Sequence, residues 1–443
     1  MTSILIFVLI KIYIGRGKVC GMAYFKRAKK AMKGNQFSLF GRFMLGIALL
    51  GPGLMVMLAD TDAGSVITAA QSGAEWGYRM ILPQLILIPM LFLIQEMTVR
   101  LGVVTKKGHG ELIRERFGIG WAALSVATLF LSSVGALVTE FSGIAGVGAL
   151  FGLPAWFTVG LSTVLLIVIG LTGSYLRVER IGIAVGLFEL FFIPAAIIAR
   201  PDWHAVGVGL IMVPLNHPQY LYMLAANVGA VIMPWMIFYQ QGAVIEKGLT
   251  IKSLKHSRWD TLGGSILTQV IMIAVVVTTA ATFGRSHSSH PLDTIQQIAT
   301  GLVPFLGTFG ANLVFGMGML GASFIASIVV SLAGSWGIGE AFGFKHSLND
   351  KVKDAKLFYF IYTMTHVLGA VLVIVSINLV RLSIDVEVMN AMLLPIVIGL
   401  LLALEAKALP VEWKMKGLYK YTVWGVSLLV IGFGLFMTVS LFV

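Results

Sequence analysis

An apolar segment near the N-terminus carries two acidic residues, in the run Gly51-Pro-Gly-Leu-Met-Val-Met-Leu-Ala-Asp-Thr-Asp-Ala-Gly-Ser-Val66. Apolar or small residues flank this run on both sides. An acidic side chain at mid-membrane depth costs about 2.5–3.5 kcal/mol, so such residues usually face the interior of a helix bundle and mark an ion path. The Gly64-Ser65 step is a weak point at which backbone carbonyls can turn toward a cavity. Asp60 and Asp62 at such a break predict a cation site.

Composition predicts an all-α polytopic membrane protein. Hydrophobic residues make up 58% of the chain and charged residues 12%, against roughly 25% charged residues in soluble domains. A helix that crosses the membrane needs about 20 predominantly apolar residues. Eleven transmembrane helices are expected on this basis. The expected spans are 43–70, 78–102, 118–150, 154–173, 182–199, 221–246, 261–284, 303–338, 357–380, 387–409 and 419–442.

The positions of the Lys and Arg residues along the chain predict which side of the membrane each loop faces. A net charge of +12 would suggest nucleic acid in a soluble protein, but no nucleic-acid partner is expected here. All but four of the 32 Lys and Arg residues lie in the N-terminal tail or after even-numbered spans, the exceptions being Arg79, Arg200, Arg285 and Arg381. The positive-inside rule then predicts a cytoplasmic N-terminus and, with eleven spans, a C-terminus outside. Compact loops favour the bacterial inner (cell) membrane.

One transmembrane domain is expected over residues 43–443, preceded by a basic cytoplasmic tail over 1–42. The apolar run 4–10 is too short to span, and we interpret it as part of the tail or as an interfacial segment rather than a signal-peptide core. The lone Cys20 leaves no disulfide within the chain. A monomer in the lipid bilayer is expected.

Span 6 is interrupted like span 1, in the run Asn227-Val-Gly-Ala-Val-Ile-Met-Pro-Trp-Met-Ile-Phe-Tyr-Gln-Gln241. Pro234 removes a backbone donor and frees a carbonyl one turn earlier, near Ala230. Broken helices five spans apart predict two inverted repeats with a site near the membrane midplane. Repeat 1 is expected at about 43–199, repeat 2 at about 221–409, and an added helix 11 at about 419–442.

These segments resemble the Nramp family of divalent-metal transporters, which carries Asp-Pro-Gly-Asn eight residues after Gly-Pro-Gly in helix 1 and Met-Pro-His in helix 6. The corresponding residues here are Gly51-Pro52-Gly53, then Asp62-Ala63-Gly64-Ser65, and Met233-Pro234-Trp235. The stretches Gln71–Tyr78 and Arg100–Thr105 also look like family segments. The resemblance implies a LeuT-type inverted repeat (5+5) with broken helices 1 and 6. It also implies a metal site made by Asp62, Ser65, Met233 and the carbonyls of Ala59 and Ala230.

The chain departs from the family pattern at several positions. Ala63, Ser65 and Trp235 replace the family's Pro, Asn and His. The helix-3 pattern Thr-Asp-x-x-Glu appears as Thr139-Glu140-Phe141-Ser142-Gly143, so one carboxylate is missing, and Asp60 is an added one. These departures resemble the divergent branch described as Nramp-related magnesium transporters.

The departures predict which ion is carried and whether protons accompany it. Trp235 does not titrate near neutrality and Gly143 has no side chain, so tight coupling to protons is not expected. Mg²⁺ keeps several waters and needs one or two carboxylates, which the shorter Ser65 and the added Asp60 favour, whereas the Met233 thioether suits softer metals. We expect Mg²⁺ and Mn²⁺ as transported substrates and no cofactor. The alternative is a proton-coupled Mn²⁺/Fe²⁺ importer of the ordinary Nramp type.

Individual residues keep alternative interpretations. Asp60 either adds charge near the ion or caps a half-helix, and Ser65 either binds the ion or bonds the helix backbone. Met233 can be ordinary packing, and Glu140 either lines the path or pairs with a neighbour. Trp235, Gln240 and Asn390 are candidates for the surroundings of the ion. Glu189, flanked by Leu and Phe, is interpreted as half of a structural intramembrane pair.

Two other classes of function find less support. An enzyme would need a nucleophile–base set or a cluster such as His-Glu-x-x-His, and most histidines lie in tails or loops. A channel needs a ring or filter repeated around a pore, and the chain has one acidic break per half at most. The sequence therefore favours a secondary transporter with alternating access over an enzyme or a channel.

Overall fold

A computed structural model describes residues 51–284, 292–376 and 378–442, which form helices and connecting turns without a strand. These helices belong to one compact unit that begins at Gly51. The all-α prediction is confirmed. The predicted tail over 1–42, its apolar run and Cys20 lie outside the described residues.

The helices follow the predicted order of spans. The first half contains α4 (Pro52–Asp60), α5 (Ala63–Trp76), η1 (Gly77–Met80), α6 (Ile81–Thr105), α7 (His109–Phe117), α8 (Ile119–Leu150), α9 (Ala155–Gly170), α10 (Tyr175–Gly186), η2 (Leu187–Phe191) and α11 (Phe192–Ile198). The second half contains α12 (Trp203–Gly209), α13 (Pro218–Val231), α14 (Pro234–Glu246), η3 (Ile251–Ser253), α15 (Leu254–Thr282), α16 (Ile295–Thr300), α17 (Val303–Phe342), α18 (Lys356–Val375), α19 (Leu379–Ala408) and α20 (Gly417–Phe442).

The chain is a multi-pass membrane protein. Nine helical stretches in the described part are long and apolar enough to cross a membrane. The first of them, Ala63–Thr105, joins part of predicted span 1 to span 2, and the apolar helix Ala155–Gly170 is shorter than the rest. The total of eleven spans therefore stays a prediction.

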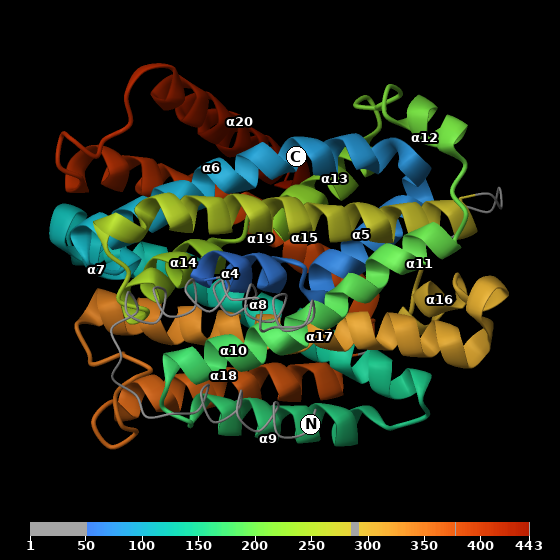
Figure 1. Cartoon of the computed structure of the whole chain (residues 1–443), viewed down its shortest axis with the longest axis horizontal. Helices are drawn as coiled ribbons and strands as arrows, with labels where there is room; N and C mark the ends of the chain where they lie inside the picture. Colours follow the sequence, from blue (N-terminus) through green and yellow to red (C-terminus); the bar gives the residue numbers. More distant parts are fainter. Residues whose placement is uncertain (1–50, 285–291, 377, 443) are drawn as a thin grey trace, which may run out of the picture. The chain divides into compact units, whose positions relative to one another are not determined.

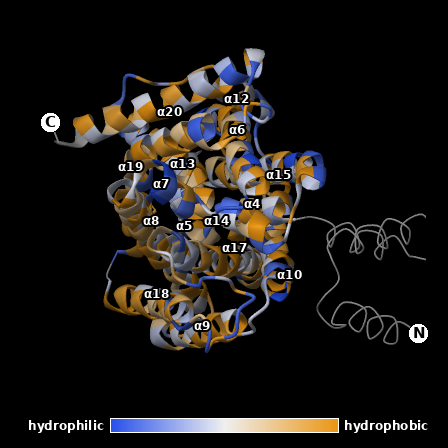
Figure 2. Ribbon diagram, turned by 90° about the vertical axis from the view of Figure 1, so that its left-hand side faces the viewer, coloured by the Kyte–Doolittle hydropathy of each residue, from blue (hydrophilic) through white to orange (hydrophobic). Residues whose placement is uncertain are grey.

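Lipid explains the large apolar side chains on the outside. The outer helix α18 is largely coloured hydrophobic in Figure 2. Exposed large apolar side chains include Phe130, Val164, Phe360, Val371 and Leu429. In a membrane such surfaces face acyl chains, and polar groups must find partners inside the bundle.

The two interrupted helices lie in the middle of the bundle. In Figure 1, α4 and α5 run across its centre between α15 on one side and α17 and α8 on the other, and these elements are in contact. The second interrupted pair, α13 and α14, packs on α19 and α6. A side chain at Gly229 would collide with the Glu387 backbone carbonyl, so glycine lets α13 and α19 approach closely. Both breaks are therefore enclosed by other helices.

Candidate cation site between two broken helices

The break between α4 and α5 is made by Thr61 and Asp62. Asp62 is the N-cap of α5, and its Oδ1 accepts a hydrogen bond from the Ser65 backbone N–H at 2.7 Å. Such a cap stabilises a helix start by about 0.5–2 kcal/mol. The Oδ2 atom is buried and has no hydrogen-bond partner among the described residues. Asp62 thus uses one oxygen to start a helix, and the other makes no hydrogen bond within the described part of the chain.

The break lies upstream of the predicted weak point. Gly64 and Ser65 are helical residues in the first turn of α5, so the helix is interrupted before this step, within the interval 60–65 in which the break was predicted. The physical reason is that Asp62 caps a new helix before the glycine is reached. Gly64 has a different use, because a Cβ at this position would collide with Glu387 Oε1 and lie 3.1 Å from Thr139 Oγ1.

Both breaks free a backbone carbonyl of the kind predicted to bind the ion. The N–H that would continue the helical bond from Ala59 belongs to Ala63, and it donates instead to Glu140 Oε2 at 3.1 Å. The N–H that would serve Ala230 is missing, because residue 234 is proline. The same spacing of four residues therefore produces a freed carbonyl in each broken helix.

A hydrogen bond joins the two breaks. The Ser65 hydroxyl in α5 donates to the Ala230 carbonyl in α13 at 2.8 Å. Two predicted ligands thus bond to each other, as the backbone-bonding interpretation of Ser65 expected, although across helices rather than within one. The Ser65 oxygen keeps lone pairs that can still accept or coordinate.

The second break carries Met233 and Trp235. Met233 is the extended N-cap of α14, and its Sδ accepts a hydrogen bond from the Trp235 indole Nε1–H at 3.1 Å. Both side chains are fully buried. The indole N–H of Trp235 therefore binds a lone pair of the Met233 sulfur, which was predicted to face the ion.

Glu140 and Glu387 bring two further carboxylates to the start of α5. Glu140 Oε2 accepts from Ala63 N–H, and its Oε1 lies 3.3 Å from the Thr139 hydroxyl, whose one hydrogen also has the Ala136 carbonyl as an acceptor at 2.7 Å. Glu387 accepts from Asn390 Nδ2 at 2.9 Å, while its Oε1 has no partner among the described residues. Asn390 in turn accepts from the Ser132 hydroxyl at 2.7 Å. Asn390 thus reaches the site only through Glu387.

The remaining predicted residues face α15. Asp60, the last residue of α4, accepts at Oδ2 from the Thr268 hydroxyl at 3.4 Å. Gln240 Nε2 donates to the Thr261 hydroxyl at 3.5 Å. Neither residue hydrogen-bonds to Asp62, Ser65 or Ala230 in the described part of the chain.

The site is buried, and its carboxylates form no ion pair with a basic side chain in the described part of the chain. Asp62, Ser65 and Met233 are each 0% exposed. The ion pairs formed within residues 51–284, 292–376 and 378–442 lie elsewhere, for example between Lys247 and Glu179. In the same residues no three His, Cys, Asp or Glu side chains gather as a metal cluster. A cation would therefore meet mixed ligands, namely one carboxylate oxygen, a hydroxyl, freed carbonyls and a thioether.

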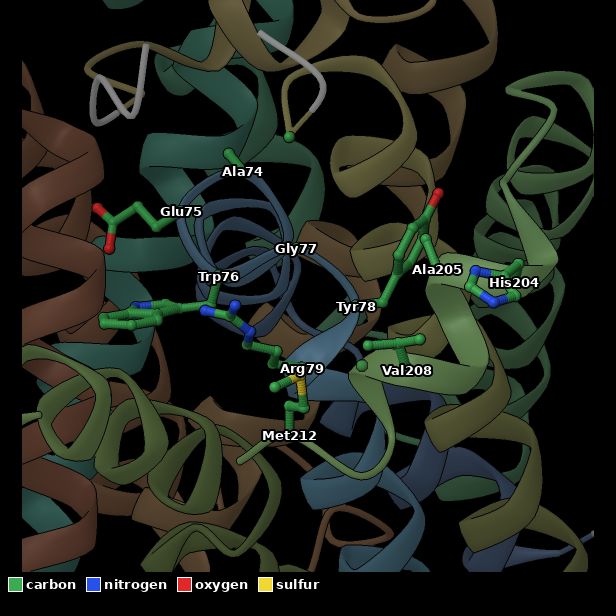
Figure 3. Close-up of a pocket in the computed structure, with 12 residues that line it drawn as sticks. Ala74, Glu75, Trp76, Gly77, Tyr78, Arg79, His204, Ala205, Val208 and Met212 are labelled. Carbon is green, nitrogen blue, oxygen red and sulfur yellow. The ribbon is translucent and has the colours of Figure 1, made fainter. Parts of the chain in front are cut away.

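Two cavities open near the C-terminal end of α5, beyond the site. The larger, about 850 Å³, is lined by Gln71, Glu75, Tyr222 and Arg381 among others. The smaller, about 510 Å³, is drawn in Figure 3, where Tyr78 and Arg79 lie beside Val208 and Met212. Neither cavity is lined by Asp62. Gln71, nine residues after Asp62 on the same helix, is the wall residue that comes closest to it in sequence.

Comparison with known proteins identifies the family. Residues 53–440 match the family model described as natural resistance-associated macrophage protein-like (Nramp). The chain belongs to this family. One relative, the divalent metal cation transporter MntH of Yersinia pestis (strain Pestoides F), is 27% identical over 300 residues, which cover 65% of this chain and 71% of that protein. The MntH of Ralstonia nicotianae is 29% identical over 297 residues, covering 64% and 67%.

Solved structures confirm the LeuT-type fold. The Eremococcus coleocola manganese transporter, in complex with an aromatic bis-isothiourea substituted compound, superposes with a TM-score of 0.73 at 18% identity, covering 91% of this chain and 87% of that one. MhsT in complex with L-phenylalanine superposes with a TM-score of 0.56 at 14% identity, covering 88% and 98%. The predicted family and architecture are thus confirmed, whereas the divergent branch stays a prediction.

Two residues near the breaks were missed or misread in the sequence, and one contact has no local signal. Glu387 lies against Gly64, 323 residues away, and no pattern along the chain announces this contact. Thr268, a hydroxyl residue in an apolar helix, was not predicted to contact Asp60. Glu189 was interpreted as half of a structural pair, but its two oxygens have no hydrogen-bond partner among the described residues.

Proposed function

We propose that this Nramp-family chain is a secondary transporter that carries divalent cations, Mg²⁺ and Mn²⁺, across the bacterial inner membrane by alternating access. The observation that carries the proposal is the buried, unpaired Oδ2 of Asp62 at the start of α5, together with Ser65, which hydrogen-bonds both to Asp62 Oδ1 and to the freed carbonyl of Ala230. A buried carboxylate without a cationic partner is costly, and a divalent ion removes this cost. The named relatives are divalent metal transporters, which agrees with this proposal.

Preference for a hard ion follows from the donors that remain available. Asp62, Ser65, Ala59 and Ala230 offer oxygen, the atom that Mg²⁺ and Mn²⁺ prefer. The soft donor, Met233 sulfur, is engaged by the Trp235 N–H at 3.1 Å. Softer metals such as Cd²⁺ therefore lose most of the advantage that a thioether would give them.

Weak coupling to protons is supported by two positions. Trp235 brings no titratable group to the site. At Gly143, a Cβ would already lie 2.5 Å from Ser323 Oγ and 2.7 Å from Ala63 Cβ, so the missing carboxylate has no room. One observation favours the proton-coupled alternative, namely that Glu140 and Glu387 are two carboxylates close to Asp62.

Alternating access requires a barrier on each side of the ion. On the predicted cytoplasmic side, the first N–H groups of α4 at Gly51 and Gly53 donate to Asp260 at 3.1 and 2.9 Å. On the predicted outer side, the larger cavity ends at Gln71. We infer that the outer barrier is the thinner one. We also infer a monomeric carrier rather than an enzyme, with the N-terminus cytoplasmic and the C-terminus outside.

Uptake into proteoliposomes tests the function. Mg²⁺, Mn²⁺ and Ca²⁺ are offered in parallel while the internal pH is recorded. We expect saturable Mg²⁺ and Mn²⁺ uptake without a matching pH change. Asp62→Asn, which preserves the N-cap, should reduce uptake at least about a hundredfold, the loss of roughly 3 kcal/mol of binding or transition-state stabilisation. Proton entry in fixed ratio to metal would establish the alternative, and full activity of Asp62→Asn would remove the proposed site.

A further inference from the structure

One face of α5 carries polar side chains from the Asp62 site to the larger cavity. Residues three or four apart in a helix lie on the same side of it. The polar residues at these spacings are Ser65, Thr68, Gln71, Ser72 and Glu75. The first four are buried and Glu75 is half-buried, and Gln71 and Glu75 line the cavity. This polar face of α5 therefore joins the cavity to the site within one helix.

Two neighbouring helices connect the same two places. Helix α13 places Met223 at the cavity wall and the Ala230 carbonyl at the site. Helix α19 places Ile384 at the cavity wall and Glu387 against Gly64. At a rise of about 1.5 Å per residue, these positions are roughly 10 Å apart along α13 and roughly 4.5 Å apart along α19. The barrier between the cavity and the site is thus thin and bounded by three helices.

Thr68 lies within this barrier, between Ser65 and Gln71 on the polar face of α5. Its side chain is 0% exposed, and its hydroxyl has no hydrogen-bond partner among the described residues. The hydroxyls of Ser142 and Thr163, by contrast, donate to the carbonyl four residues before them. A buried hydroxyl without a partner is costly, and an ion or water passing along the polar face would remove this cost.

Gln71 is held by hydrogen bonds at both ends of its amide. Its Oε1 accepts from the Leu292 backbone N–H at 2.9 Å, and its Nε2 donates to Glu75 Oε1. An amide suits both partners, because the backbone N–H only donates and the carboxylate only accepts. The Gln71 side chain is 2% exposed although it borders the cavity. It is therefore fixed at the cavity end of the polar face.

The segment that donates to this amide is anchored as well. Leu292 is buried in the hydrophobic core. Helix α16 begins two residues later with a capping box formed by Thr294 and Gln297. A Cβ at Gly146 would lie 2.4 Å from Ile295 Cδ1, so α16 packs closely on α8. The bond from Leu292 thus ties the polar face of α5 to α8 through a short, capped helix.

We infer that Gln71 is the gate residue of the outer ion path, because its bonds to Leu292 and Glu75 close the polar face of α5 between the larger cavity and Asp62. The inference rests on the proposed transport function and specifies the entrance to the same site. Gln71 acts by holding the segment before α16 in place, so it is a positioning residue and not a ligand. When these bonds break, the ion passes Thr68 and reaches Asp62.

Cysteine labelling in lipid nanodiscs tests the gate without depending on transport. In a Cys20→Ser background, Thr68→Cys is exposed to a membrane-impermeant methanethiosulfonate that carries a trimethylammonium group. Gln71→Met keeps the length of the side chain but loses both bonds, so labelling should become at least about tenfold faster. The matched control is Gln219→Met, the same change at another residue of the cavity wall, which should leave the labelling rate unchanged.

An exchange of the two bonded groups separates gating from a general loosening of the fold. Gln71→Glu alone places two carboxylates side by side, so Thr68→Cys should be labelled as fast as in Gln71→Met. Adding Glu75→Gln gives a carboxylate that accepts from both the Leu292 N–H and the new amide, so the rate should return to within about threefold of the original. Ala70→Cys, at a buried position on the opposite face of α5, should stay unreactive in every variant.

Three results would overturn the inference. The first is equal labelling of Thr68→Cys with and without Gln71→Met. The second is an equal gain at Ala70→Cys, which would show that the fold has loosened. The third is fast labelling in the exchanged pair when thermal unfolding shows that it is folded. Absence of uptake by the unchanged chain contradicts the proposed function, whereas unchanged labelling with normal uptake contradicts the gate alone.

Discussion

At the scale of single residues, the two oxygens of the Asp62 carboxylate have different roles: one is fixed by a hydrogen bond, and the other is left for the proposed ion. Asp62 Oδ1 is fixed by the N–H of Ser65, and this bond orients Oδ2. Ala59 and Ala230 present carbonyls whose usual helical partners are diverted or missing. The donors are therefore oriented before an ion arrives, which lowers the cost of binding.

The contact between Trp235 and Met233 predicts a change in metal preference. Trp235→Phe removes the indole N–H and frees the Met233 sulfur, so uptake of Cd²⁺ relative to Mg²⁺ should rise by roughly threefold to tenfold. The ratio is measured by competition in proteoliposomes. The control is Trp336→Phe, because Trp336 is buried but its Nε1 has no acceptor among the described residues. An unchanged ratio in Trp235→Phe would show that the indole does not restrain the sulfur.

At the scale of helices, the close approach of α5 and α19 depends on one glycine. Gly64→Ala would push the Glu387 carboxyl away from the start of α5, since the new Cβ takes its space. We expect uptake to fall about tenfold with a loss of stability of about 1 kcal/mol, because the displaced group is the end of a flexible side chain. Uptake and thermal unfolding of the purified protein report the two effects separately.

The control is a glycine of another helix, and the rescue is a second change at Glu387. Gly263→Ala in α15 should behave like the unchanged chain, because its Cβ would meet nothing within 4 Å. Adding Glu387→Asp to Gly64→Ala shortens the opposing side chain and should recover part of the uptake. If Gly64→Ala alone transports normally, the approach of Glu387 has no role in transport.

The two breaks differ in how far the sequence could predict them. Pro234 lacks a donor whatever surrounds it, so the freed carbonyl of Ala230 followed from local chemistry and was predicted correctly. The break in helix 1 was predicted near Asp60–Ser65, which is correct, but its exact position is set by the capping residue Asp62 rather than by the Gly64-Ser65 step. Contacts such as Glu387 with Gly64 join residues distant in the chain, and only the fold brings them together.

At the scale of the whole molecule, the charge distribution predicts which side each loop faces. In a Cys20→Ser background, His204→Cys in α12 should react with a membrane-impermeant maleimide in intact cells. Glu412→Cys, between α19 and α20, should react only after the membrane is permeabilised. Both positions are exposed in the structure, so a failure to react reports sidedness rather than burial. The opposite labelling pattern would invert the proposed orientation.

The overall architecture was more predictable than the site. The apolar segments and two interruptions indicated membrane helices in two inverted repeats, because such helices are specified by length and hydropathy. The resemblance to the Nramp family then implied the LeuT-type fold. The misreading of Glu189 has a physical origin as well. A lone acid in a membrane helix is expected to pair with another group, and the sequence does not reveal that the neighbours of Glu189 are the Thr61 hydroxyl and two other acids, Asp62 and Asp60.

The central claim is that the two breaks hold a divalent cation between them, and anomalous scattering from Mn²⁺ in crystals of this chain tests it most directly. We predict one strong peak at coordination distance, about 2.0–2.6 Å, from Asp62 Oδ2, between the carbonyls of Ala59 and Ala230. A metal peak only elsewhere, with the space between α4–α5 and α13–α14 empty at saturating Mn²⁺, would contradict it.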